Sequence, residues 1–146
     1  MRIIKLNIIS LLFILQTACS NIYTQTPPYT ITTPKCELGG ISFEFFYAGI
    51  SFSFLNKSEK SISSITASFM LFDGKTQTSP FIGSNKFEIK KLTLISPGEN
   101  RDVLISLDNF IFIAPIEPYL IDFFYISKIE YTDGSIWEDK YGIFRI

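Results

Sequence analysis

Apolar side chains recur at every second position over long stretches of this sequence. Between residues 50 and 54, Ile and Phe alternate with Ser, and residues 65–71 repeat the same alternation. A period of two places alternate side chains on opposite faces of a β-strand, whereas a surface helix needs a period of 3.6. The pattern therefore predicts half-buried strands and an all-β fold.

Turn signals divide the later part of the chain into seven or so short strands. Residues 56–60 form a polar turn, Pro97 and Gly98 form another, and Pro115 and Pro118 interrupt the apolar stretch 110–120. With 146 residues the chain has the length of one domain, and it shows no convincing amphipathic helix. These signals predict an antiparallel β-sandwich over residues 41–146, with a small open barrel as the alternative.

Two local patterns make sharper predictions. In residues 87–94 the apolar phase slips at Lys90 and Lys91, which indicates a bulge there. Asp133-Gly134 between two strand-like runs is typical of a type I′ hairpin, in which Tyr131 faces Ile136 and Lys128 faces Asp139. The core is expected to contain Phe52, Phe54, Phe69 and Phe123.

The N-terminus has the order of a secretory signal. Arg2 and Lys5 precede the apolar stretch 6–15, and small residues follow it. Ten positions are too few to cross a bilayer, which takes about 20 residues. Residues 1–18 are therefore predicted to be a signal peptide, and residues 19–40, rich in Thr and Pro, to be an extended linker.

The end of the signal resembles the lipobox of bacterial lipoproteins. Ala18 and Cys19 fit that motif, with Gln16 at the usual position of Leu. The resemblance implies cleavage before Cys19, lipidation of its thiol and attachment to a membrane of the bacterial cell envelope, at the outer membrane or cell surface. Ordinary cleavage near Ala18, which leaves Cys19 a plain thiol, is the alternative. A freely secreted protein with a Cys19–Cys36 disulfide is a further possibility.

A second resemblance concerns the strand that ends near residue 73. Phe69, Leu71 and Asp73 match the motif of the FxLYD-type immunoglobulin-like domain of bacterial envelope proteins, with Phe72 in place of the Tyr. The resemblance covers residues 41–131. It implies an immunoglobulin-like sandwich and no catalytic residues.

The composition excludes several kinds of chemistry. The chain has no His, the commonest general base and metal ligand, and its 13 basic and 14 acidic residues give a net charge of −1, with no basic block to bind nucleic acid. No phosphate loop or other cofactor motif occurs. No cofactor or metal is predicted: Ca²⁺ binding at Asp133, Glu138 and Asp139 is conceivable, but no loop spaces these carboxylates as a coordination shell. The carboxylates that a small envelope hydrolase would have to use are Asp102, Asp108, Glu130, Asp133, Glu138 and Asp139.

The favoured function is therefore binding or scaffolding without catalysis. Phe46, Phe72 and Trp137 are out of phase with the core residues of their strands, as is Phe124, so alternation predicts that they face outward. Exposed aromatic rings that lie together usually mark an interface. Phe46, Phe72 and Trp137 are the predicted binding residues, and the predicted partners are the membrane, through the lipid, and an unidentified envelope protein or other envelope component.

Overall fold

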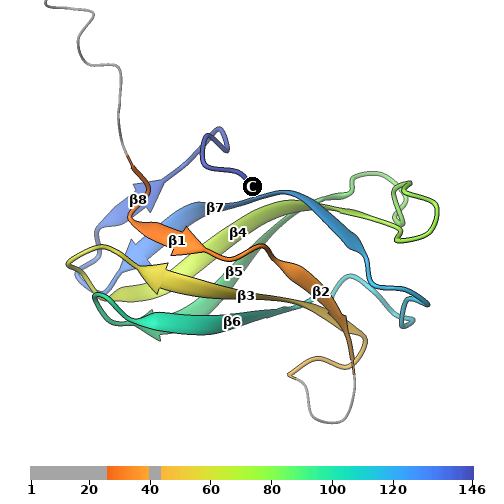
Figure 1. Cartoon of the computed structure of the whole chain (residues 1–146), viewed down its shortest axis with the longest axis horizontal. Helices are drawn as coiled ribbons and strands as arrows, with labels where there is room; N and C mark the ends of the chain where they lie inside the picture. Colours follow the sequence, from red (N-terminus) through yellow and green to blue (C-terminus); the bar gives the residue numbers. More distant parts are fainter. Residues whose placement is uncertain (1–25, 40–43) are drawn as a thin grey trace, which may run out of the picture.

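The chain folds into an antiparallel β-sandwich, seen in a computed structural model that describes residues 26–39 and 44–146 (Figure 1). The described residues contain strands and no helix, as the alternation predicted. The predicted signal peptide and Cys19 lie outside the described residues. The strands are β1 (Tyr29–Ile31), β2 (Lys35–Leu38), β3 (Ala48–Asn56), β4 (Ile62–Phe72), β5 (Lys86–Ile95), β6 (Asn100–Ser106), β7 (Leu120–Tyr131) and β8 (Ile136–Glu138).

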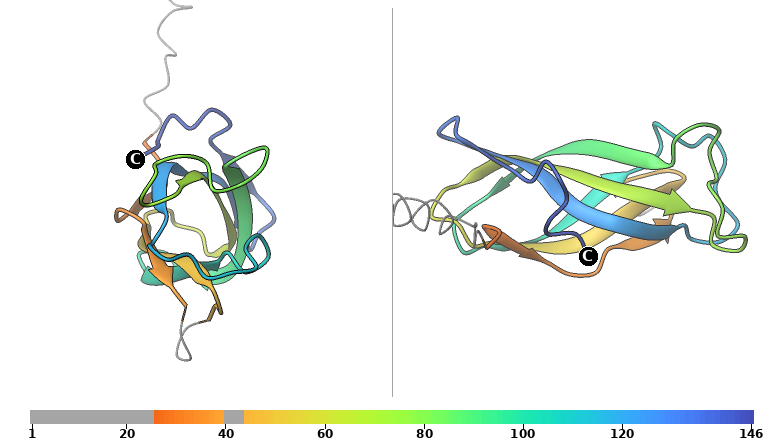
Figure 2. Two further views of the ribbon diagram at one scale, coloured as in Figure 1. Left: turned by 90° about the vertical axis from the view of Figure 1, so that its right-hand side faces the viewer. Right: turned by 90° about the horizontal axis from the view of Figure 1, so that it is seen from above.

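The strands form two four-stranded sheets that face each other (Figure 2). In the first sheet, β1 and β2 follow one another along one edge of β3, and β6 pairs with the other edge. The second sheet has the order β5-β4-β7-β8. All these pairs are antiparallel.

The core lies between the sheets and is rich in phenylalanine. Phe52, Phe54 and Phe69 are buried, as the alternation predicted. The ring of Phe124 packs against Phe52 and Phe69, with centroids 5.0 and 5.8 Å apart. Each fully buried side chain of this kind contributes about 1.5–3 kcal/mol of transfer free energy.

The linker prediction is wrong for residues 29–38, because β1 and β2 lie there and pair with β3. Tyr29 is only 2% exposed, and its ring stacks on Phe54 at 5.4 Å. Backbone pairing with β3 and one buried aromatic ring hold these short edge strands in place. Strands of this kind form without a sustained alternation of apolar and polar residues. The sandwich therefore begins at Tyr29 rather than at residue 41.

Strand β7 contains an irregularity that reverses the predicted phase of its two phenylalanines. Its register against β4 shifts three times, between Ile62 and Ser64, between Thr66 and Ala67, and between Ser68 and Met70. Phe123 has a φ of 51°, in the left-handed region. As a result Phe124 is 1% exposed and Phe123 is 44% exposed. The prediction that Phe123 fills the core is therefore wrong, because a bulge shifts which residues face inward.

The β7–β8 hairpin differs from the prediction by one residue. A type I′ turn needs positive φ at both central residues, but here only Gly134 has one, at 82°. The N–H of Gly134 donates to the Tyr131 carbonyl, and the N–H of Tyr131 donates to the Ser135 carbonyl, each at 3.0 Å, which makes a three-residue loop. Trp137 consequently pairs with buried Ile129 and faces the core.

Strand β5 keeps its alternation throughout, contrary to the predicted slip at Lys90 and Lys91. Its register against β4 shifts later, opposite Ser63, between Leu92 and Ile95. Leu92 and Leu94 therefore lie on the outer face, where both are exposed.

Candidate binding surface

The two ends of the sandwich are built differently. At one end, called here the turn end, short turns at residues 57–61, 96–99 and 132–135 join the strands (Figure 1). The chain also enters β1 there, because the N–H of Lys57 donates to the Pro28 carbonyl at 2.9 Å. At the other end, called here the loop end, lie residues 44–47, 73–85 and 107–119, as the pairing of Phe72 with Leu120 and of Gly49 with Ser106 requires.

Large apolar side chains are exposed across the loop end. Phe46 is 76% exposed, Phe112 80% and Ile116 98%. The three turns of the turn end contain no large apolar residue. Exposed apolar groups that gather in one region of a surface mark an interaction site more often than scattered ones. Among the described residues, those at the loop end are Phe46, Ile82, Phe110, Phe112, Ile113, Ile116 and Leu120.

Two carboxylates hold these loops in place. Asp108 accepts hydrogen bonds from the backbone N–H groups of Phe46 and Tyr47, at 2.6 and 2.8 Å, which joins the β2–β3 and β6–β7 connections. Burial by itself would raise the pKa of Asp108, but these bonds hold it below its usual value. Asp73 accepts from the N–H groups of Lys75 and Thr76, and these bonds lower its pKa. The loop end thus has defined backbone geometry and an apolar surface.

A groove of about 460 Å³ runs between the two long connections of the loop end. Ile113, Pro115 and Ile116 form its apolar side, and Asp73 and Lys75 lie on the other. The β4–β5 connection is anchored by Phe81, whose ring lies 5.0 Å from Phe87 and 6.0 Å from Tyr119. The groove offers an apolar wall with charged groups at its rim, an arrangement suited to binding.

The three predicted binding residues do not share one surface. Phe46 is at the loop end, and Phe72, the last residue of β4, is half-buried. Trp137 packs on Tyr29, with ring centroids 5.6 Å apart. Trp137 pairs with Ile129, and Ile129 pairs with Ile65 on β4. Along β4, Ile65 lies seven residues before Phe72, so Trp137 is about seven strand positions away from Phe72. At ~3.3 Å per residue the separation is about 23 Å. The prediction that the three rings face outward together is therefore wrong.

The alternation pattern missed most of the exposed apolar residues, because Phe112, Ile113 and Ile116 lie in a loop without a strand period. A signal was present in the sequence. Pro115 and Pro118 break the apolar stretch 110–120, and apolar residues in a segment that cannot join a sheet have no assigned place in the core. Such a segment is a candidate surface.

The carboxylates that a hydrolase would have to use stabilise separate parts of the structure. Asp133 pairs with Lys60 at 2.7 Å, and Glu130 pairs with Lys90 at 2.6 Å, which lowers the pKa of Glu130 to about 2. Asp139 is buried and accepts from the N–H groups of residues 143 and 144. Within residues 26–39 and 44–146, no group of three or more Asp, Glu, Cys or His side chains is arranged to hold a metal ion.

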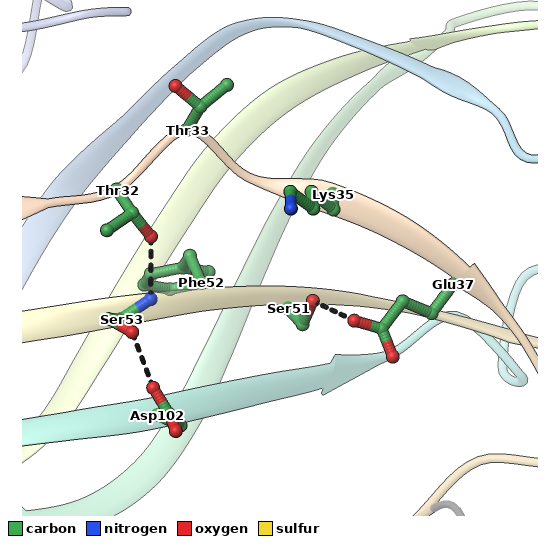
Figure 3. A pocket seen from close by; sticks show the side chains of 8 residues that line it. All are labelled: Thr32, Thr33, Lys35, Glu37, Ser51, Phe52, Ser53 and Asp102. Atoms are coloured by element: carbon green, nitrogen blue, oxygen red, sulfur yellow. Dashed lines mark hydrogen bonds between the residues drawn. The ribbon is translucent and has the colours of Figure 1, made fainter.

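A second, polar groove of about 560 Å³ lies on the outer face of the first sheet (Figure 3). It forms where Thr32 and Thr33 interrupt the edge between β1 and β2. The hydroxyl of Ser51 donates to Glu37, and that of Ser53 donates to Asp102. The two serine hydroxyls of the groove are thus held by carboxylates of the same sheet.

Comparisons with known proteins support the fold and give no function. No family model matches the chain, and no curated protein matches it. A crystal structure of a hypothetical protein from Peptoclostridium difficile 630 is similar, with a TM-score of 0.54 and 11% sequence identity, over 80% of this chain and 89% of that chain. At that identity the likeness extends to the sandwich fold alone.

Proposed function

We propose that this chain is a bacterial envelope lipoprotein, anchored through Cys19, whose β-sandwich binds or scaffolds another envelope component through the loop end. The activity is non-catalytic. The observation that carries the proposal is the gathering of exposed apolar side chains on the loops of one end, among them Phe46, Phe112 and Ile116. The surface keeps Phe46 from the sequence prediction and adds the residues around Pro115.

The position of the N-terminus supports this use of the loop end. The chain enters the sandwich at the turn end, beside Lys57, so a lipid on Cys19 would tether that end. The loop end then points away from the tether, where a partner has access. The described residues hold no helix long and apolar enough to cross a membrane.

The domain type belongs to the same proposal. We infer an immunoglobulin-like domain of the FxLYD type, in which Phe69 and Leu71 are the buried residues of the motif. Asp73, the last residue of the motif, accepts bonds from Lys75 and Thr76 and fixes the turn after β4. The motif thus leads from the core directly into a loop of the proposed surface.

Lipidation is tested by the mass of the native protein. A chain that begins at an acylated Cys19 is expected, and Cys19→Ser should remain uncut and unacylated. Cys36 is half-buried in β2 with no disulfide partner among the described residues, and burial raises the pKa of its thiol. An unmodified chain with a Cys19–Cys36 disulfide would contradict the anchor.

The binding surface is tested by photocrosslinking in intact cells. A photoreactive residue at Phe112, in the loop end, is compared with one at Lys57, in the turn end. We expect a discrete adduct from position 112 that is absent from position 57 and is lost when Ile113 and Ile116 are changed to Ser. Equal adducts from both positions, or none from position 112, would contradict the proposal.

A further inference from the structure

A small cavity of about 150 Å³ lies on the outer face of the second sheet, beneath the C-terminal segment 139–146. This segment is fixed at both ends. The buried carboxylate of Asp139 accepts from residues 143 and 144, and the N–H of Ile146 donates to the Phe124 carbonyl at 2.9 Å. The side chains that matter here are Ser68, Lys86, Phe123, Tyr125, Tyr141 and Arg145.

Ser68 brings a buried hydroxyl to this cavity. The residue is 1% exposed, and its Oγ has no hydrogen-bond partner among the described residues. Nearly all buried polar side-chain atoms in proteins have a partner, in the protein, in ordered water or in a ligand. At the wall of this cavity, the hydroxyl is therefore left without a partner from the described residues.

Two cations line the same cavity without a matching carboxylate. Neither Lys86 nor Arg145 forms an ion pair with any residue that the structure describes. The Arg145 guanidinium is positioned 5.7 Å from the centre of the Phe123 ring, and Nη1 donates to the Gly142 carbonyl at 3.3 Å. Glu88, opposite Ser68 in β5, already accepts from Ser127 at 2.8 Å. Glu88 lies outside the lining, whose charged side chains, Lys86 and Arg145, are both cationic.

The backbone around the cavity is held in an unusual conformation. Phe123 has a φ of 51°, which is uncommon for a residue other than glycine. Gly142 has a φ of 63°, and a Cβ added there would lie 3.0 Å from the ring of Tyr125. Glycine adopts such a φ without strain, so only Phe123 is strained here, and strained residues of its kind concentrate at binding sites.

We propose that this cavity binds a small oxyanion, a carboxylate or phosphate group, through Lys86, Arg145 and the Ser68 hydroxyl. Its volume is about half the lower limit of roughly 300 Å³ for pockets that hold drug-sized ligands, so it fits an ion or the end group of a larger molecule. The site is separate from the loop end and does not depend on the function proposed above.

The test is isothermal titration calorimetry of the full chain in detergent micelles, with inorganic phosphate and with acetate at constant ionic strength. We expect saturable binding of at least one anion, and the preferred one identifies a phosphate or a carboxylate as the ligand chemistry. Lys86→Gln and Arg145→Gln should each weaken binding about tenfold, the loss of one charge-assisted hydrogen bond. Lys57→Gln removes the same charge at the turn end and should leave affinity unchanged.

Ser68→Ala separates binding from folding. Because its hydroxyl has no protein partner, the variant should melt no lower than the wild type while binding the preferred anion several-fold more weakly. If neither anion shows saturable binding, the proposal is wrong. Equal weakening by Lys57→Gln and Lys86→Gln would also overturn it, because the attraction would then come from overall charge.

Discussion

The two ends of this sandwich use the same eight strands for different purposes. At the turn end, short polar turns satisfy their hydrogen bonds locally, and those at residues 57–61 and 96–99 connect the two sheets. At the loop end, two carboxylates fix long connections whose large apolar side chains remain exposed. The difference indicates that stability is concentrated at one end and that the other is free to serve recognition.

Asn56 is the centre of the turn end. It is fully buried, and its Nδ2 donates to the carbonyls of Lys60, Ile95 and Ser96. Its Oδ1 accepts from the N–H and the hydroxyl of Ser58. One amide therefore ties the β3–β4 turn of the first sheet to the end of β5 in the second.

Asn56→Ala is expected to have the largest effect. The substitution leaves the buried Ile95 carbonyl and the part-buried carbonyls of Lys60 and Ser96 without this donor, and we expect a loss of about 3 kcal/mol in the free energy of unfolding. Chemical denaturation measures this loss directly, and the melting temperature should fall by roughly 10 °C. Asn56→Asp keeps the size but faces three carbonyls with an acceptor, so it should destabilise similarly. A melting temperature within two or so degrees of wild type for both variants would show that the turn end is not the stable end.

Trp137→Ala comes next. Since the hairpin register turns Trp137 toward Tyr29 and the core, the variant should lose about 2 kcal/mol, less than a fully buried Trp. Its neighbour Ile136 is exposed and should tolerate Ala within about 0.5 kcal/mol. The comparison is read from paired denaturation curves. If Ile136→Ala were less stable than Trp137→Ala, the register predicted from the sequence, in which Trp137 faces solvent, would be correct.

Trp137 also illustrates how far the sequence could lead. Alternation predicted the all-β sandwich and the burial of Phe52, Phe54 and Phe69, because the burial of one face imposes the same residue pattern along a whole strand. It failed at Trp137, where a loop longer by one residue reversed the face of β8. Turn type depends on the backbone conformation of Asp133, and the dipeptide Asp-Gly is compatible with more than one.

Other features depend on contacts between distant segments. The bulge that exposes Phe123 arises where β7 meets β4, and β1 is ordered by Tyr29 stacking on Phe54. Neither has a local signature in the sequence. For the candidate surface, the sequence identified Phe46, while the exposure of Phe112 and Ile116 depends on how the β6–β7 connection is held by Asp108.

Asp108→Asn should weaken the loop end by a smaller amount, about 1 kcal/mol at neutral pH, because the neutral amide accepts hydrogen bonds from Phe46 and Tyr47 less strongly. The pKa of Asp108 is lowered in the folded state, so its carboxylate stabilises the protein above about pH 3.9, the ordinary value. That contribution is lost as the pH falls through the lowered pKa. Melting temperatures from pH 6 to pH 2 should therefore fall less in the variant than in the wild type. If the melting temperatures of the variant and the wild type fall equally with pH, the Asp108 carboxylate does not stabilise the folded state in this way.

The smallest effect is expected from Ile116→Ser. The side chain is 98% exposed, so it contributes almost no buried area, and the free energy of unfolding should change by less than about 0.5 kcal/mol. The melting temperature of the full chain, compared with that of Asn56→Ala, measures the contrast between the two ends. A loss above about 1 kcal/mol would mean that Ile116 supports the fold, and the loop end would then be a second structural end. An unchanged melting temperature together with a lost crosslink from position 112 would assign Ile116 to recognition.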